Sequence, residues 1–140
     1  MISIDLAWQL NAVGVRWHPR SGDRFTIMAP ALRGEIFTIS DMMVEAHEFR
    51  TGTVLGFNGT TEWALDSVAQ DDALWLPAED QLRTMLGAAF RSLVAADGSY
   101  VVTMAAPSGT EQTFQAASAA DAYAQALLVL VNLSVGAMPA

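Results

Sequence analysis

Short apolar segments separated by turn signals fill the middle of the sequence and restrict this part of the chain to β-structure. Thr51-Gly52 and Asn58-Gly59 are turn signals, because glycine and asparagine adopt positive φ angles at little cost. Ahead of the first turn, residues 42–49 alternate with a period of two, as a strand with one buried face does. The pattern predicts an antiparallel β-meander over residues 25–76.

Six strands are expected in this meander, although two of them, residues 35–39 and 42–49, could instead be one strand bent at Ser40-Asp41. The six strands are residues 25–28, 35–39, 42–49, 53–57, 60–68 and 73–76. A short helix capped by Thr60 or Thr61 is the alternative for residues 60–68.

Helical patterns flank the meander on both sides. Ser3 is a good N-cap for a helix that ends near Val13. Pro77 suits the first position of a central helix, whose apolar face would extend as far as Leu93. Gly87 would cost that helix about 1 kcal/mol relative to alanine, or would let another backbone pack close to it.

The C-terminal part combines a β-hairpin with an apolar helix. Residues 100–104 and 111–117 are the expected hairpin strands, and Asp97-Gly98 turns the chain before them. Ser118 is the expected N-cap of the last helix, Asp121 would complete a capping box, and the helix would end near residue 134. Its apolar run is shorter than the roughly 18 residues of a membrane span. A core helix is the leading interpretation, with a self-association surface or a membrane anchor as alternatives.

These elements predict the α+β class. The expected fold is an antiparallel β-meander sheet with an N-terminal helix, a central helix, a β-hairpin and an apolar C-terminal helix. A length of 140 residues suits a single globular domain spanning residues 1–140. The apolar last helix also favours a homodimer formed through that helix.

Charge and composition exclude several functions. Seven arginines and no lysine stand against 15 acidic residues, for a formal net charge of −8. Such a chain repels phosphate backbones and anionic lipid, so we expect it to bind neither nucleic acid nor membrane. Without cysteine, disulfides and thiolate chemistry are excluded. The first residues lack the basic and apolar regions of a signal peptide, so we expect a cytoplasmic protein.

Asp41, Glu45 and His47 form one candidate site. On a strand they would point to the same face, where two carboxylates and an imidazole could hold a divalent metal or act as a general base. A solvated sheet face is the simpler interpretation, because zinc sites usually contain more histidine or cysteine ligands.

Trp17, His18, Arg20 and Arg24 form a second candidate. An arginine could bind a carboxylate or phosphate while Trp17 stacks on a planar ligand. The structural alternative makes Trp17 a core residue and the arginines part of a surface network.

A third candidate surrounds the Asn58-Gly59 turn, where polar side chains could meet a partner. Its residues are Asn58, Glu62, Trp63 and Asp66. A carboxylate-rich run continues from there and could form an acidic patch for a basic partner. That run consists of Glu62, Asp66, Asp71 and Asp72.

Three segments carry a resemblance to known proteins. They are Trp17-x-Pro19-x2-Gly22-Asp23-Arg24-Phe25, residues 57–67, and Leu76-Pro77-x2-Asp80-Gln81-Leu82. In these segments the chain resembles a group of small, acidic, uncharacterised bacterial proteins, some of which are automatically labelled as pilus-assembly proteins. The resemblance implies no catalytic residues. A pilus-assembly ATPase would need a nucleotide-binding loop, and the sequence contains no such motif.

The sequence therefore favours a non-enzymatic accessory or protein-interaction domain without a cofactor. One alternative is a small-molecule ligand-binding protein or small hydrolase that uses Asp41, Glu45 and His47. Another is an acidic inhibitor or immunity-type protein.

Overall fold

A computed structural model describes residues 1–28, 34–39, 45–49, 52–56, 67–69 and 72–136. The chain divides into two compact units: unit 1 consists of Met1–Val15 with Pro77–Ala140, and unit 2 of Arg16–Leu76. Unit 2 is thus inserted in the sequence of unit 1. The single-domain expectation stays a prediction, because compactness does not establish whether the units fold together.

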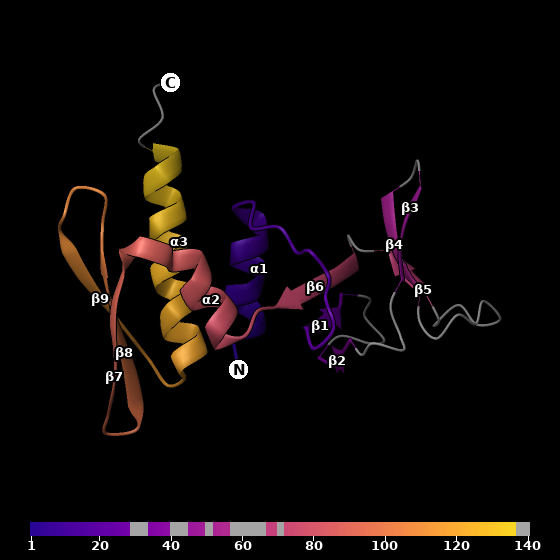
Figure 1. Cartoon of the computed structure of the whole chain (residues 1–140). Coiled ribbons are helices and arrows are strands. Elements are labelled where there is room, and N and C mark those ends of the chain that lie inside the picture. The colour runs from indigo at the N-terminus through magenta and orange to yellow at the C-terminus, as the bar shows by residue number, and fades with distance from the viewer. Residues whose placement is uncertain (29–33, 40–44, 50–51, 57–66, 70–71, 137–140) are drawn as a thin grey trace. The chain divides into compact units, whose positions relative to one another are not determined.

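Unit 1 contains all the α-helices and one antiparallel sheet of the described part of the chain. Its elements are α1 (Ile4–Ala12), α2 (Glu79–Leu86), the 3₁₀ turn η2 (Gly87–Ala89), β7 (Phe90–Ala96), β8 (Ser99–Ala105), β9 (Glu111–Ala116) and α3 (Ala119–Gly136). The strand order is β7-β8-β9. The predicted hairpin is confirmed, and β7 adds a third strand to it (Figure 1).

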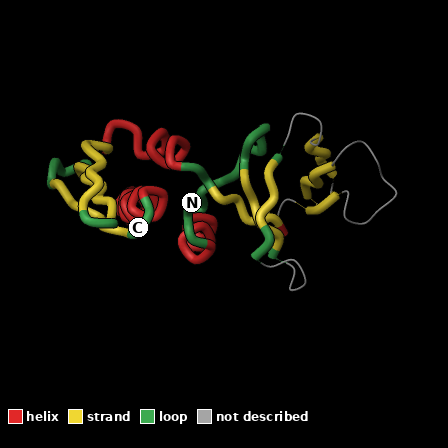
Figure 2. The backbone as a smooth tube through the Cα atoms, turned by 90° about the horizontal axis from the view of Figure 1, so that it is seen from below, coloured by secondary structure: helices red, strands yellow, loops and turns green. Residues whose placement is uncertain are grey.

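The first half of α3 forms the centre of unit 1. It packs on β8 and β9 on one side and on α1 and α2 on the other (Figure 2). Alanines at positions such as Ala122 and Ala126 are fully buried and let these elements approach closely, while Val102 and Met104 fill the sheet side. Burial decreases toward the end of the helix, where Leu133 is exposed. In the described part of the chain, no helix combines the length and apolar character that crossing a membrane requires.

The N-termini of α1 and α3 are joined by hydrogen bonds. Ser3 caps α1 by accepting from the backbone N–H of Leu6 at 3.3 Å, and Ser118 accepts from the N–H of Asp121 at 3.1 Å. The Asp121 carboxylate does not complete the predicted capping box: Oδ1 instead accepts from the backbone N–H of Ser3 at 2.7 Å. One carboxylate thus serves both helix ends, which its negative charge also stabilises.

The central helix is shorter than predicted. α2 ends at Leu86, and Gly87 follows with φ 56° and ψ −128°, a conformation that only glycine adopts without strain. A Cβ at Gly87 would meet no atom of the described residues within 4 Å, so the expected close backbone contact is not found among them. Phe90 and Leu93, which we expected on a helical face, belong instead to β7.

The described residues of unit 2 contain six short strands. They are β1 (Arg24–Ile27), β2 (Ile36–Thr38), β3 (Glu45–Phe49), β4 (Gly52–Gly56), β5 (Ser67–Ala69) and β6 (Ala73–Leu76). The α+β class is confirmed. The meander, however, divides into two antiparallel sheets with the orders β2-β1-β6 and β3-β4-β5. The first and last strands pair with each other, so that Phe25 lies opposite Trp75.

An aromatic cluster packs against the β2-β1-β6 sheet. Its buried members are Trp17, Phe25 and Ile39. The Phe25 ring centroid lies 5.4 Å from that of Trp17 and 5.5 Å from that of Phe37, distances typical of favourable aromatic pairs. The segment before β1 packs into this cluster through Trp17.

Candidate interaction site

A tight turn over residues 20–23 leads into β1. The N–H of Asp23 donates to the carbonyl of Arg20 at 3.1 Å, and Gly22 at the third position has φ 91°, as a type II turn requires. The N–H of Gly22 donates to the carbonyl of Ile39, and the N–H of Ile39 donates to the carbonyl of Asp23. The turn predicted at Ser21-Gly22 is confirmed, and it is attached to the end of β2.

The Asp23 carboxylate organises this segment. Its Oδ2 atom accepts from the indole Nε1–H of Trp17 at 2.9 Å and from the backbone N–H of Arg20 at 3.0 Å. Asp23 is only 5% exposed and Trp17 only 8%, so the hydrogen bond between them is buried, whereas the bond from Arg20 is partly buried. Hydrogen bonds to a carboxylate are stronger than neutral ones, so the loss of either bond would destabilise this segment.

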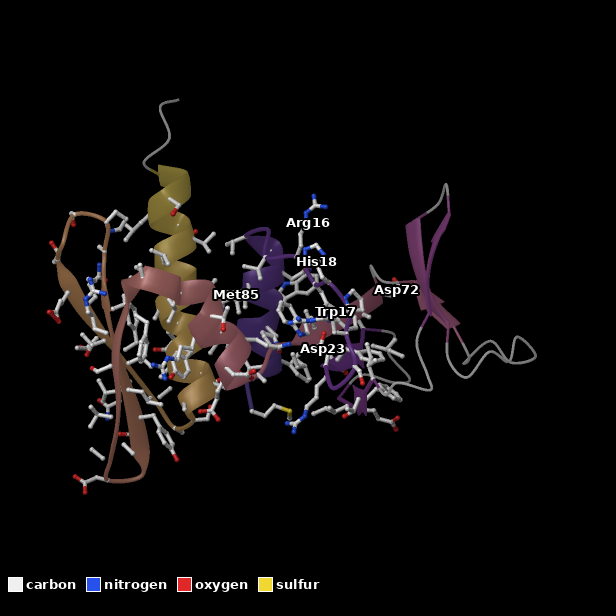
Figure 3. The ribbon with its side chains drawn as sticks, viewed as in Figure 1. Arg16, Trp17, His18, Asp23, Asp72 and Met85 are labelled. Carbon is white, nitrogen blue, oxygen red and sulfur yellow. The ribbon has the colours of Figure 1, made fainter. Side chains whose placement is uncertain are left out.

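The basic side chains of the segment lie on its surface. Arg16, His18, Arg20 and Arg24 are all exposed, and they include three of the seven arginines in the chain. Figure 3 shows Arg16 and His18 on the outer side of the segment, with Trp17 turned toward Asp23. We call residues 16–24 the arginine segment.

The arginine segment combines a fixed backbone with exposed cationic side chains. Arginine presents five N–H donors in a planar fork, which suits carboxylate groups on a partner. Trp17 is a core residue, as in the structural alternative, because it is buried and its indole donates a hydrogen bond. The predicted stacking of a ligand on Trp17 stays a prediction.

A second tryptophan of the same cluster has a different environment. Trp75 packs against the buried aromatic residues, and its buried Nε1 atom has no hydrogen-bond partner among the residues that the structure describes. An unpaired buried donor costs about 1–3 kcal/mol. Trp75 therefore contributes apolar packing without a compensating polar contact.

The other sequence-predicted residues are only partly placed. Glu45 and His47 lie in β3, where their backbones pair with Gly56 and Val54. Asp41 lies outside the described residues, as do Asn58, Glu62, Trp63, Asp66 and Asp71. Asp72 is exposed just before β6. Among the described residues, no three histidine, aspartate or glutamate side chains gather closely enough to hold a metal ion.

Asp23 is the residue that sequence reasoning did not single out. The available signal was its position three residues after Arg20 and directly after Gly22, since aspartate in a turn often accepts from nearby backbone N–H groups. Its bond to Trp17 spans six residues and depends on how the chain folds back.

Comparison with known proteins identifies no relative. The chain matches no family model, and no curated protein or solved structure matches it. The resemblance to small acidic bacterial proteins therefore stays a prediction.

Proposed function

We propose that this chain is a non-enzymatic accessory or protein-interaction domain that acts in the cytoplasm and binds an acidic protein partner through the arginine segment. The observation that carries the proposal is the buried Asp23 carboxylate, which holds the backbone that bears Arg16, His18 and Arg20. A backbone held in this way loses little conformational entropy on binding, which favours affinity.

The charge distribution supports an acidic protein partner. Three arginines and one histidine lie within nine residues of a chain whose net charge is −8. Net negative charge repels nucleic acid, whereas a local cationic segment can still pair with carboxylates on a protein surface. Complementary charges at an interface mainly increase specificity and association rate.

Binding measurements on a charge-neutralised variant test this proposal. The wild-type chain is used to isolate a partner from cells that encode it, and affinity for the purified partner is then measured by calorimetry. We expect Arg16→Gln with Arg20→Gln to raise the dissociation constant about tenfold or more. Added salt should weaken wild-type binding, because exposed charges are screened.

Ser108→Glu with Thr110→Glu is the matched control. These exposed residues follow β8, and the double substitution makes the chain two charges more negative, as the arginine variant does. The control should bind as the wild type does. Equal weakening by both variants, or no weakening by the arginine variant, would contradict the proposal.

A further inference from the structure

The sheet of unit 1 has two edges of opposite character. β9 carries polar side chains along its exposed positions, including Glu111, Thr113 and Gln115. β7 instead has four consecutive exposed apolar residues, from Leu93 to Ala96. Natural edge strands are usually protected by charges, proline or bulges, and β7 has none of these between Ser92 and Ala96.

Both faces of β7 are open as well as its edge. Leu93 is 36% exposed and Val94 is 53% exposed, although alternation along a strand places them on opposite faces. α3 packs on β8 and β9 and leaves this end of β7 uncovered. An added strand would therefore gain apolar contacts on both faces together with backbone hydrogen bonds.

The turn at the end of β7 determines which backbone groups face outward. Asp97 and Gly98 have φ angles of 48° and 76°, as a two-residue type I′ turn requires, and Ala96 lies opposite Ser99. The pair that flanks such a turn is hydrogen-bonded, and bonded pairs alternate along the ladder. Leu93 and Ala95 therefore direct their N–H and C=O groups toward the free edge.

An antiparallel pair of two β7 strands matches this pattern when its two-fold axis passes at Val94. Leu93 of one copy then lies opposite Ala95 of the other in a hydrogen-bonded pair, and Val94 lies opposite Val94. The same register brings Arg91 near Asp97 twice, because both residues are three positions from Val94 in the sequence. Arg91 lies at the irregularity between Phe90 and Ser92, and Asp97 lies in the turn, so these side chains meet at the ends of the paired segment and not within its regular ladder. These are the charged residues of the segment 90–97, and registers centred on Leu93 or Ala95 do not pair them.

We propose that β7 is a self-association edge at which two copies of this chain pair antiparallel about Val94. The result is a continuous six-stranded sheet, with an Arg91–Asp97 ion pair at each end of the junction. In the single chain the Arg91 guanidinium donates to the carbonyls of Ala88 and Phe90, and its remaining N–H groups can reach the second copy. The apolar contact is small, so a weak, reversible dimer is expected.

Sedimentation velocity of the purified full chain over a concentration series tests the proposal. We expect Val94→Lys to raise the dimer dissociation constant at least about tenfold, because two lysines would face each other at the axis. Val94→Thr is the control, since it keeps a β-branched side chain without charge. Circular dichroism checks that each variant is folded. Because Val94 is exposed, we expect both substitutions to leave the fold intact.

Two complementary charge variants test the register itself. Arg91→Glu places a second carboxylate near Asp97, whereas Asp97→Lys places a second cation near Arg91, so we expect each variant alone to be monomeric. An equimolar mixture should form a heterodimer. One end of its junction then pairs the introduced glutamate with the introduced lysine, and the other end pairs Arg91 with Asp97. Failure of the mixture to associate would overturn this register.

Leu133→Lys distinguishes the β7 edge from the apolar C-terminal helix. Leu133 is exposed near the end of α3, where a homodimer was also predicted. We expect this variant to dimerise as the wild type does. A wild-type chain that stays monomeric at the highest concentrations, or a dimer lost in Leu133→Lys and kept in Val94→Lys, would overturn the proposal.

Discussion

Each unit uses one aspartate to hold its backbone, but over very different distances along the chain. In unit 2, Asp23 binds groups three and six residues away. In unit 1, Asp121 binds the backbone of Ser3, 118 residues away. The first arrangement involves only residues 17–23, whereas the second requires α1 and α3 to have packed together. Local hydrogen bonds can therefore determine the backbone of a surface segment, and long-range hydrogen bonds stabilise the packing of the core.

Removal of the Asp23 carboxylate should have the largest effect. Asp23→Ala deletes both hydrogen bonds to Oδ2 and leaves the Trp17 indole buried without that acceptor. We expect a loss of about 3 kcal/mol in the free energy of unfolding, measured by urea denaturation with tryptophan fluorescence. Asp72→Ala, at an exposed aspartate of the same unit, should change it by less than about 0.5 kcal/mol. Equal effects would remove the contrast between a buried and an exposed carboxylate.

Unit 1 also contains a feature that is determined locally, the end of α2 at Gly87. Gly87→Ala should lower the free energy of unfolding by about 2 kcal/mol, because alanine is strained at φ 56° and ψ −128° although its Cβ would have space. A helix continuing through this position would instead be stabilised by about 1 kcal/mol. The sign of the change in the denaturation midpoint shows whether α2 ends at Gly87 or continues through it. Ala88→Ser is a control for the effect of a substitution next to this position.

The long-range contact of Asp121 should be weaker than the local one of Asp23, because it is only partly buried. We expect Asp121→Ala to cost about 1.5 kcal/mol, from the lost hydrogen bond and the lost charge at the α3 N-terminus. Asp121→Asn keeps an acceptor oxygen and should cost less. Hydrogen exchange of the Ser3 amide should accelerate in Asp121→Ala, and an unchanged rate would show that the bond contributes nothing.

The smallest effect is expected at Trp75. Trp75→Phe removes a buried indole donor that has no acceptor, which is stabilising, and also removes part of the ring packing, which is destabilising. The two effects oppose each other, so the free energy of unfolding should change by less than about 0.5 kcal/mol. Trp17→Phe should cost about 2 kcal/mol, because Asp23 then loses a donor. A larger cost at Trp75 than at Trp17 would contradict the role assigned to the Asp23 hydrogen bond.

Features decided by neighbouring residues were predictable from the sequence. Ser3 caps α1, the turn at Ser21-Gly22 is present, and β6 spans the residues expected for the last strand of unit 2. The backbone conformations at these positions follow from the local side chains and glycines. The basic residues of the arginine segment can be read directly from the sequence, and their role in binding stays a prediction. The role of Asp23 was not predictable, because it depends on where Trp17 lies.

Features decided by distant pairing were not predictable. Nothing near β1 specifies that it pairs with β6, far along the chain, and nothing near Ser3 specifies Asp121. β7 was missed for another reason. Its apolar residues continue the helical spacing of α2, and only Gly87 and the Asp97-Gly98 turn signal a strand between them.

The bond between Ser3 and Asp121 also has a consequence during protein synthesis. The ribosome produces α1 before unit 2 and α3 after it. α1 therefore lacks its partner helix until α3 has been translated. A stalled or truncated nascent chain that lacks α3 would display the apolar face of α1 to chaperones and proteases.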